Sequence, residues 1–333
     1  MQTIPLADTG HHTTRLGFGC STLMGATNRR ASLRLLETAY DAGIRHFDVA
    51  PMYGYGEAES CLGEFLQHHR NDITVTTKFG IPPPKNSALI QVGRSIAAPI
   101  VKKIPNLKRR LAQTASALTR NEARPAFTAS QAKASLDRSL TALRTNRIDL
   151  WLLHEVTAHD LEDDALLRLL EDEVEKGTIG SFGIGSSADK IPALLAEHPA
   201  YCRTLQYEWS ILDASTQPTK PFRIHHRALT SNFRDLHKAL LNNKPLTQRW
   251  SESTNTDLSN PQTLPQTPSQ ILASLMLKAA LVMNPSSIIL FSSKDPTHIH
   301  ANVQTATDNT LELPARELYN LVQSEHVQLP CNV

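Results

Sequence analysis

The feature that most constrains the fold of this chain is the alternation of short apolar runs with amphipathic segments along its 333 residues. The apolar runs have the length of strands and occupy residues 14–19, 44–49, 72–78, 148–154, 180–186, 204–210, 222–229 and 286–293. In the segments between them, apolar residues recur at helical spacing, as in residues 31–43, 58–69, 130–144 and 164–177. The pattern predicts eight strands that alternate with helices.

Strands joined by helices run parallel, because each crossover returns the chain to the same edge of the sheet and covers its faces. Eight such units predict an α/β fold of the closed (β/α)8 TIM barrel type, and we expect residues 1–333 to form one domain. The seventh run is the least typical, since its "RIHHR" is polar for a buried strand. Thr128 or Ser130 is expected to cap a helix, and Gly43 and Gly177 are expected to end two others.

Two segments interrupt the alternation. Residues 80–127 follow the third strand as an insertion with nine Lys or Arg and a single acid, Glu122. We interpret this basic insertion as a solvated surface, with a docking surface for an acidic substrate or partner as the alternative. Residues 244–270 are rich in Ser, Thr, Asn and Pro, which predicts a mobile polar loop.

The composition favours a small-molecule role. The net charge of +2 lacks the strong basic excess of nucleic-acid-binding domains. The chain has neither a signal-peptide pattern at its start nor an apolar run of about 18 residues, so we expect a cytoplasmic protein without a membrane span. The four cysteines form no C-x-x-C pair, and we expect reduced thiols rather than a zinc site or disulfides at Cys20, Cys61, Cys202 and Cys331.

Reactive side chains stand where the predicted strands end. Asp48 ends the second strand with Tyr53 just beyond it, Lys78 ends the third, His154 ends the fourth, and Gln206 lies in the sixth. Because the active sites of such barrels lie on the loops that follow the strands, we expect these groups to meet on one rim. A buried Lys–Asp pair beside a tyrosine is expected to lower the phenol's pKa from about 10, which suits proton transfer near neutral pH.

Six motifs resemble the aldo-keto reductase superfamily along nearly the whole chain: "FDVAPMYGYGEAE", "TTKFG", "SLTALRTNRIDLWLLH", "FGIGSS", "LQYEWSIL" and "LFSSKDPTHIHAN". The resemblance implies an oxidoreductase that transfers a hydride between NADP(H) and an aldehyde, ketone or sugar-type carbonyl or alcohol, without a metal. It implies that Tyr53 is the general acid, that Lys78 and Asp48 tune it, and that His154 orients and polarises the substrate carbonyl.

The same resemblance implies a set of cofactor contacts. Gln206 would hold the nicotinamide carboxamide and Trp209 would stack on the ring, while Ser186 belongs to a Gly-Ser pair that replaces the family's usual Ser-Asn. The positions that match the adenosine end are Ser293, Lys294, His298 and Asn302. A lysine there can pair with a 2′-phosphate, so NADP is expected in preference to NAD.

Two other functions fit parts of the sequence. "GIGSSA" follows a strand and precedes Glu208 by about twenty residues, so residues 183–208 fit the fingerprint of a Rossmann-type dehydrogenase. The chain could instead be a nucleotide-binding barrel that acts as a binding or regulatory partner. Four preceding strand and helix units argue against the first alternative, and the presence of all four catalytic positions argues against the second.

Overall fold

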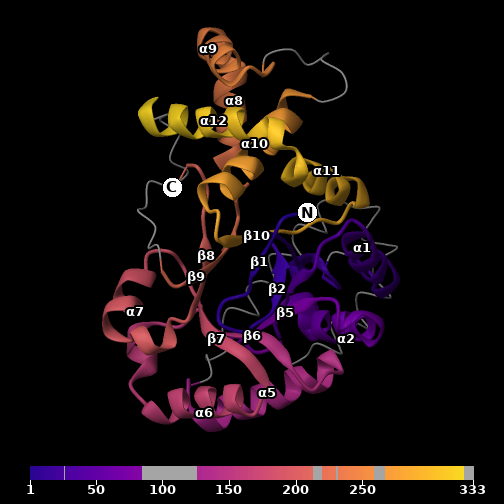
Figure 1. The fold of residues 1–333 in the computed structure, drawn as a ribbon, viewed down its shortest axis with the longest axis vertical. Helices are drawn as coiled ribbons and strands as arrows, with labels where there is room; N and C mark the ends of the chain where they lie inside the picture. The colour runs from indigo at the N-terminus through magenta and orange to yellow at the C-terminus, as the bar shows by residue number, and fades with distance from the viewer. Residues whose placement is uncertain (26, 85–125, 213–219, 230–231, 259–266, 326–333) are drawn as a thin grey trace.

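The computed structural model describes residues 1–25, 27–84, 126–212, 220–229, 232–258 and 267–325. Its centre is a closed barrel of parallel strands in the order β10-β3-β4-β5-β6-β7-β8-β9 (Figure 1). The strands are β3 (Leu16–Gly19), β4 (His46–Asp48), β5 (Thr74–Phe79), β6 (Ile148–His154), β7 (Ile179–Gly185), β8 (Thr204–Glu208), β9 (Phe222–His226) and β10 (Ser287–Phe291). Each predicted strand is present, and the TIM-barrel prediction is confirmed.

Helices surround the barrel, with α8, α9, α10 and α12 grouped together at one end of the view in Figure 1. The described helices are α1 (Arg29–Asp41), α2 (Ala58–His69), α5 (Ala129–Leu143), α6 (Asp164–Glu175), α7 (Ile191–Glu197), α8 (Asn232–Asn242), α9 (Lys244–Thr254), α10 (Pro268–Met283), α11 (Pro296–Thr307) and α12 (Glu312–Glu325). Within the described ranges, none of them is long and apolar enough to cross a membrane.

The helix boundaries follow local chemistry that the sequence carries. Thr128 accepts a hydrogen bond from the backbone N–H of Gln131 and so caps α5. Gly43 and Gly177 follow α1 and α6 with φ of +94° and +71°, a conformation that glycine adopts without steric cost. The expected cap and both expected stops are confirmed. The nine basic residues of the 80–127 insertion all lie outside the described residues.

The amino-terminal end of the barrel is closed by a hairpin of β1 (Thr3–Pro5) and β2 (His12–Thr14). Ile4 and Leu6 pack against apolar side chains that point into the barrel, among them Leu150, Ile224 and Ile288. Each of these side chains is at most 8% exposed. This plug fills the interior at the base of the barrel with apolar side chains and keeps water out of it.

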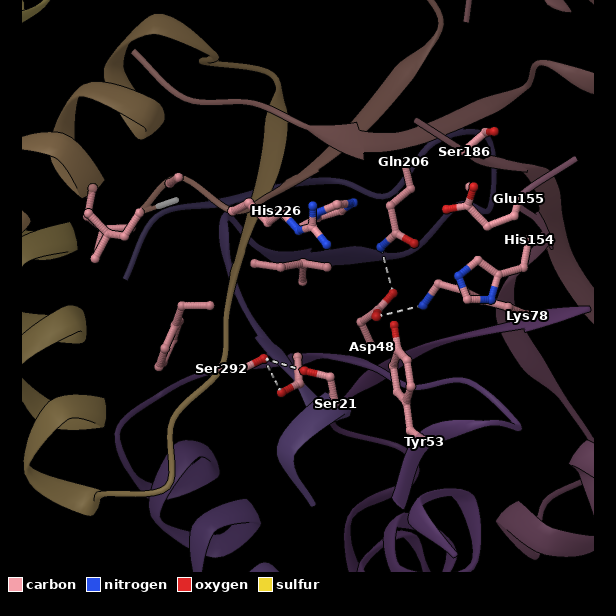
Figure 2. Close-up of a pocket in the computed structure, with 18 of the residues that line it drawn as sticks. Ser21, Asp48, Tyr53, Lys78, His154, Glu155, Ser186, Gln206, His226 and Ser292 are labelled. Carbon is pink, nitrogen blue, oxygen red and sulfur yellow. Dashed lines mark hydrogen bonds and ion pairs between the residues drawn. The ribbon is translucent and has the colours of Figure 1, made fainter. Parts of the chain in front are cut away.

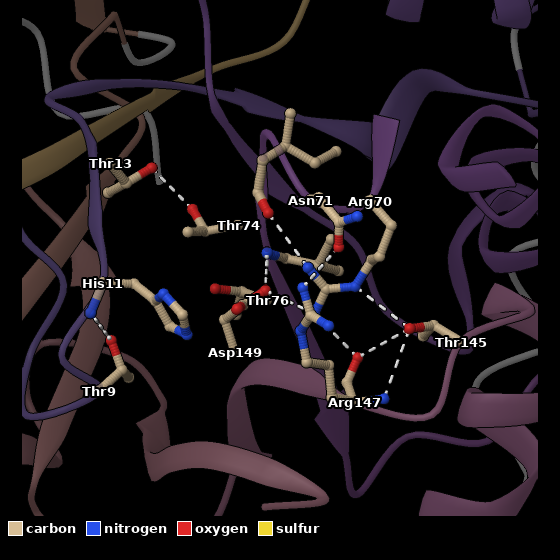
Figure 3. A network of polar contacts seen from close by, with 12 residues as sticks. Thr9, His11, Thr13, Arg70, Asn71, Thr74, Thr76, Thr145, Arg147 and Asp149 are labelled. Carbon is tan, nitrogen blue, oxygen red and sulfur yellow. Dashed lines mark hydrogen bonds and ion pairs between the residues drawn. The ribbon is translucent and has the colours of Figure 1, made fainter. Parts of the chain in front are cut away.

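A polar network fixes the end of α2 to the bases of two strands (Figure 3). Arg70 forms an ion pair of 3.0 Å with Asp149 of β6, and its guanidinium also donates to the carbonyl oxygens of Ile73 and Arg147. Asp149 in turn accepts a hydrogen bond of 2.7 Å from the backbone N–H of Val75 in β5. Because the ion pair is nearly buried and is hydrogen-bonded to backbone groups at the start of both strands, it sets the positions of α2, β5 and β6 relative to one another.

The prediction of a mobile loop over residues 244–270 is wrong at both ends, because residues 244–254 form helix α9 and residues 268–270 begin α10. Residues 259–266 of this segment lie outside the described residues. The Asn243 side chain caps α9 by accepting from the backbone N–H of Leu246. Trp250 is fully buried in an apolar cluster that includes residues of α8, α10 and α12. The segment has few aliphatic residues, but the large ring of Trp250 buries enough apolar surface to hold the helix against the protein.

The Rossmann alternative is excluded by the position of its glycines. Residues 183–185 belong to β7, which pairs with β6 on one side and with β8 on the other in the closed barrel. A Cβ atom at Gly183 would lie 2.0 Å from the carbonyl oxygen of Thr204. The glycine is therefore required by the close approach of two barrel strands, and the resemblance to a dinucleotide fingerprint has a packing cause.

Candidate active site

A pocket of about 530 Å³ opens at the carboxyl end of the barrel strands (Figure 2). The sequence-predicted residues that line it are Asp48, Tyr53, Lys78, His154, Ser186, Gln206 and Asn302. The four expected catalytic residues are thus brought together in one place, although β4, β5, β6 and the loop that carries Tyr53 are spread over about a hundred residues of sequence. The convergence follows from the barrel, whose parallel strands all end on the same rim.

The floor of the pocket is a buried ion pair. Lys78 Nζ lies 2.7 Å from Asp48 Oδ1 and also donates to the carbonyl oxygen of Val49 at 3.0 Å. The side chains of Lys78 and Asp48 are only 2% and 5% exposed. Gln206 Nε2 donates to the other carboxylate oxygen, Oδ2, at 2.7 Å. Both oxygens of Asp48 are therefore used, and the position of the ammonium group is fixed.

Tyr53 stands over this pair at the start of a tight turn, η2 (Tyr53–Gly56). Gly54 and Tyr55 both have left-handed backbone angles, with φ of +60° and +59°. A Cβ atom at Gly54 would lie 2.6 Å from the carbonyl oxygen of Leu23, so glycine is required at this point. The turn places Lys78 Nζ 5.3 Å from the centre of the Tyr53 ring. In Figure 2 the Tyr53 hydroxyl points toward Asp48 and Lys78.

The pKa of Tyr53 is raised above its ordinary value of 10.0, which contradicts the predicted lowering. The Lys78 ammonium is the largest single influence and lowers this pKa, but burial, Asp48 and Cys20 together outweigh it. Burial also tends to lower the pKa of Lys78, and Asp48 and Tyr53 reverse this effect, so that the pKa of Lys78 rises above 10.5. At neutral pH the site therefore holds a neutral phenol beside an ammonium ion.

His154 ends β6 and projects into the same pocket, as Figure 2 shows. The next residue, Glu155, has a left-handed backbone with φ of +57° and lies 3.3 Å from Lys190 Nζ. Its backbone N–H donates to the carbonyl oxygen of Gly185 in β7. The strand ends at this bend, and the His154 imidazole lies in the pocket wall, on the rim where the sequence led us to expect it.

The expected cofactor residues are divided between the pocket and its surroundings. Ser186 lines the pocket and donates its hydroxyl to the carbonyl oxygen of Val156 at 3.0 Å, so its oxygen can only accept from a ligand. Asn302 reaches the pocket from α11. Trp209 does not line the pocket; its ring is 5% exposed and stacks on Tyr319 of α12 with centroids 6.5 Å apart.

The other residues expected at the adenosine end lie at the start of α11. Ser293 is buried, and its hydroxyl donates to the carbonyl oxygen of Asp295 and accepts from the Asp295 N–H, so it shapes the turn that precedes the helix. Lys294 and His298 are exposed and do not line the pocket. Among the four expected residues, Asn302 alone faces the pocket.

Several pocket residues were not identified from the sequence, namely Ser21, Glu155, His226, Arg227, Leu229 and Ser292. His226 ends β9, and its pKa is lowered to about 4, mainly by burial. The polarity of "RIHHR" was the available signal, because a strand with polar residues at its carboxyl end is typical of a site on the barrel rim. Ser21 and Ser292, whose hydroxyl oxygens lie 3.2 Å apart, have no such signal in the sequence.

Comparisons with known proteins point to one family. The model of the Aldo/keto reductase family matches residues 15–318. The chain is 32% identical to a D-threo-aldose 1-dehydrogenase of a Pseudomonas species over 51% of this chain and 49% of that protein. It is 25% identical to an uncharacterised oxidoreductase of Bacillus subtilis over 70% of this chain and 64% of that protein. The chain thus spans about half of the length of one of these curated relatives and just under two thirds of the other.

Solved structures share the fold over nearly their whole length. The holo form of an aldo-keto reductase from Bacillus halodurans superposes with a TM-score of 0.64 at 18% identity, covering 96% of both chains. A glycerol dehydrogenase from Gluconobacter oxydans gives a TM-score of 0.66 at 16% identity over 98% of this chain and 96% of that one. An aldo-keto reductase from Klebsiella pneumoniae in complex with NADPH gives 0.60 at 14% identity over 92% and 90%.

Proposed function

Because the chain belongs to the aldo/keto reductase family, we propose that it is an NADP(H)-dependent oxidoreductase acting on an aldehyde, a ketone or a sugar-type carbonyl or alcohol. The observation that carries the proposal is the buried ion pair of Lys78 and Asp48 beneath Tyr53. The pair lies in a pocket that His154 also lines. A charged pair sealed under a phenol has little value for stability alone, since desolvation offsets most of its Coulomb energy.

The residues of the pocket fit a nicotinamide cofactor. Gln206 and Ser186 offer an amide and a hydroxyl for a carboxamide group. Gly185 leaves the space beside them open, since a Cβ atom there would lie 3.4 Å from Gln206 Oε1. The volume of about 530 Å³ lies in the ordinary range for small-molecule sites. The exposed Lys294 stands before the N-terminus of α11, where a helix favours anions, and this supports a 2′-phosphate and hence NADP over NAD.

In the reduction, Tyr53 donates its proton to the substrate oxygen as negative charge develops there. The raised pKa keeps this proton in place until the substrate is bound, and the Lys78 ammonium stabilises the phenolate that remains. Asp48 keeps Lys78 charged and in position, and His154 donates a hydrogen bond that orients the carbonyl. Bound NADPH would supply the hydride. In the oxidation the same groups act in reverse.

A paired screen tests this function. NADPH oxidation is followed over aldehydes, ketones and sugars, and NADP reduction over alcohols and lactols. The relative named D-threo-aldose 1-dehydrogenase makes aldoses the first class to examine. Turnover that disappears in Tyr53→Phe while NADPH binding persists would support the proposal, with Tyr40→Phe as the control since Tyr40 bonds to Asp72 away from the pocket. NADPH binding without turnover of any substrate would favour the binding-protein alternative.

A further inference from the structure

A second cavity, of about 490 Å³, lies at the opposite end of the barrel from the active-site pocket. We call it the basal cavity. Its lining includes the polar and charged residues Arg15, Lys278, Thr307, Asn309 and Glu312. Arg15 immediately precedes β3, whereas Gly19 at the other end of this strand lines the active-site pocket. Four residues of extended strand at about 3.3 Å each separate the two levels by roughly 13 Å, so the two cavities are distinct.

Arg15 is only 9% exposed, and its guanidinium is incompletely satisfied. One terminal nitrogen donates to Gln2 Oε1 at 2.7 Å, and the other donates to the carbonyl oxygens of Leu281 and Asn284. Among the described residues its buried Nε has no hydrogen-bond partner. A buried N–H donor without a partner carries a free-energy cost, and because this Nε is buried, Arg15 can offer a ligand in the cavity only its terminal nitrogens.

Lys278 provides a second buried cation in the lining. It is 3% exposed, and its ammonium donates to the carbonyl oxygen of Ala306 at 3.2 Å. The nearest carboxylate is that of Glu312, at 3.8 Å and half exposed. Asp308 acts on Lys278 more weakly and is already bonded to Thr310.

The two cations are short of compensating negative charge. Burial lowers the pKa of Lys278, while Glu312 and Asp308 raise it and Arg15 lowers it further. Burial also lowers the pKa of Arg15, against a smaller opposing effect of Glu312. The positive charge of Arg15 therefore acts on Lys278, both residues line the cavity, and the partly solvated carboxylate of Glu312 acts on both. A bound anion would relieve this repulsion.

We propose that the basal cavity binds a small oxyanion, a phosphate group either free or carried by a small organic molecule, with Arg15 and Lys278 as its cationic contacts. A guanidinium and an ammonium together match the oxygen atoms of a phosphate through charge-assisted hydrogen bonds. A water molecule takes up about 30 Å³. The cavity of about 490 Å³ is many times larger, so it has room for an organic group attached to the phosphate. This binding is independent of the proposed oxidoreductase activity.

Isothermal titration calorimetry on the full chain tests the proposal, with inorganic phosphate and glycerol 3-phosphate as separate probes. Lys278→Met is expected to weaken phosphate binding by at least about tenfold, because it removes a charge-assisted contact and keeps the length of the side chain. Glu312→Gln is expected to tighten binding by about two- to fivefold, since it removes a repulsive and half-exposed charge. Tighter binding of glycerol 3-phosphate would identify an organic phosphate, and equal or weaker binding would identify free phosphate.

The controls separate this site from other cationic surfaces. Lys133→Met changes an exposed lysine on α5 and should leave the phosphate affinity unchanged. Lys294 lies outside the basal cavity, at the proposed contact to the cofactor's 2′-phosphate, so Lys294→Ala reports any phosphate that binds at that second site instead. Phosphate binding that is lost in Lys294→Ala but retained in Lys278→Met would overturn the proposal, as would the absence of binding to the unmodified protein. If the Lys278→Met variant does not fold, the Glu312→Gln variant tests the proposal by itself. An unchanged phosphate affinity in that variant would count against the site.

Discussion

Gln206 Nε2 donates a hydrogen bond of 2.7 Å to Asp48 Oδ2, the carboxylate oxygen that Lys78 does not contact. The resemblance implied that Gln206 holds the nicotinamide carboxamide. In the structure one of its two N–H donors is already engaged, so a carboxamide can contact its carbonyl oxygen and its second N–H. Gln206 therefore links the expected cofactor contact to the buried ion pair beneath Tyr53.

Replacing Gln206 should destabilise the protein as well as weaken the binding of NADPH. Gln206→Leu removes a donor to a buried carboxylate, and we expect the free energy of unfolding to fall by about 1 to 3 kcal/mol. Urea unfolding followed by fluorescence measures this change, with Gln248→Leu on the exposed face of α9 as the control. Full stability in Gln206→Leu would mean that water replaces the amide at Asp48 without cost.

Buried histidines should make the protein less stable in acid. His46 lies fully buried on β4, with its ring nitrogens 3.0 Å from Thr74 Oγ1 and 3.3 Å from Thr76 Oγ1. Burial lowers its pKa to about 3, and the charge of Lys78 acts in the same direction. In the unfolded chain a histidine has a pKa of about 6.5, so between these values the unfolded state binds more protons. Stability therefore falls as the pH is lowered through about 6.5.

A substitution isolates the contribution of this histidine. Between pH 7 and pH 5, one histidine that stays neutral in the folded state accounts for a loss of about 2 kcal/mol in unfolding free energy. His46→Gln keeps a polar group beside Thr74 and Thr76, and we expect its stability to change by that much less over the same interval. Urea unfolding at the two pH values measures the difference, with the exposed His300→Gln as the control. Parallel curves for the His46→Gln and unmodified proteins would show that His46 is not the titrating group.

Cofactor preference should depend on Lys294. The Lys294→Ala variant is expected to weaken NADPH binding by about 10- to 150-fold and NADH binding hardly at all, because a charge-assisted contact to the 2′-phosphate contributes about 1.5 to 3 kcal/mol. Because Lys294 is exposed, added salt should reproduce part of the loss. Fluorescence titration with each cofactor gives both affinities. Equal losses for NADPH and NADH would remove Lys294 from the 2′-phosphate site.

The sequence predicted the barrel and the meeting of the candidate catalytic residues in one pocket because both depend on local patterns. Asp48 and Lys78 end strands whose apolar character is plain, and parallel strands must bring such ends together. The direction of the Tyr53 pKa shift could not be predicted, since it depends on how far burial outweighs one ammonium ion. Trp209 was placed on the cofactor by its motif, but its contact with Tyr319 joins residues 110 positions apart and has no local signature.

The central claim of the mechanism is that Tyr53 and Lys78 act as one unit. Tyr53→Phe keeps the ring and removes the proton, so carbonyl reduction should fall by roughly 10²- to 10⁴-fold. Lys78→Met removes the ammonium, the largest influence that lowers the Tyr53 pKa, and leaves the opposing influences of burial and Asp48 in place. Forming the phenolate then costs more free energy, and we expect the rate of carbonyl reduction to fall about as much as in Tyr53→Phe.

Removing both groups should be scarcely worse than removing either one, because residues that act together give losses that do not add. Single-turnover hydride transfer in Tyr53→Phe, Lys78→Met and the double variant measures this. Lys78→Met leaves the charge of Asp48 buried without its partner, which destabilises the protein. The measurements are therefore repeated in a second background, Asp48→Asn combined with Lys78→Met, which removes both charges and avoids this destabilisation. Losses that multiply in both backgrounds, or an active Tyr53→Phe enzyme, would place the proton donor elsewhere in the pocket.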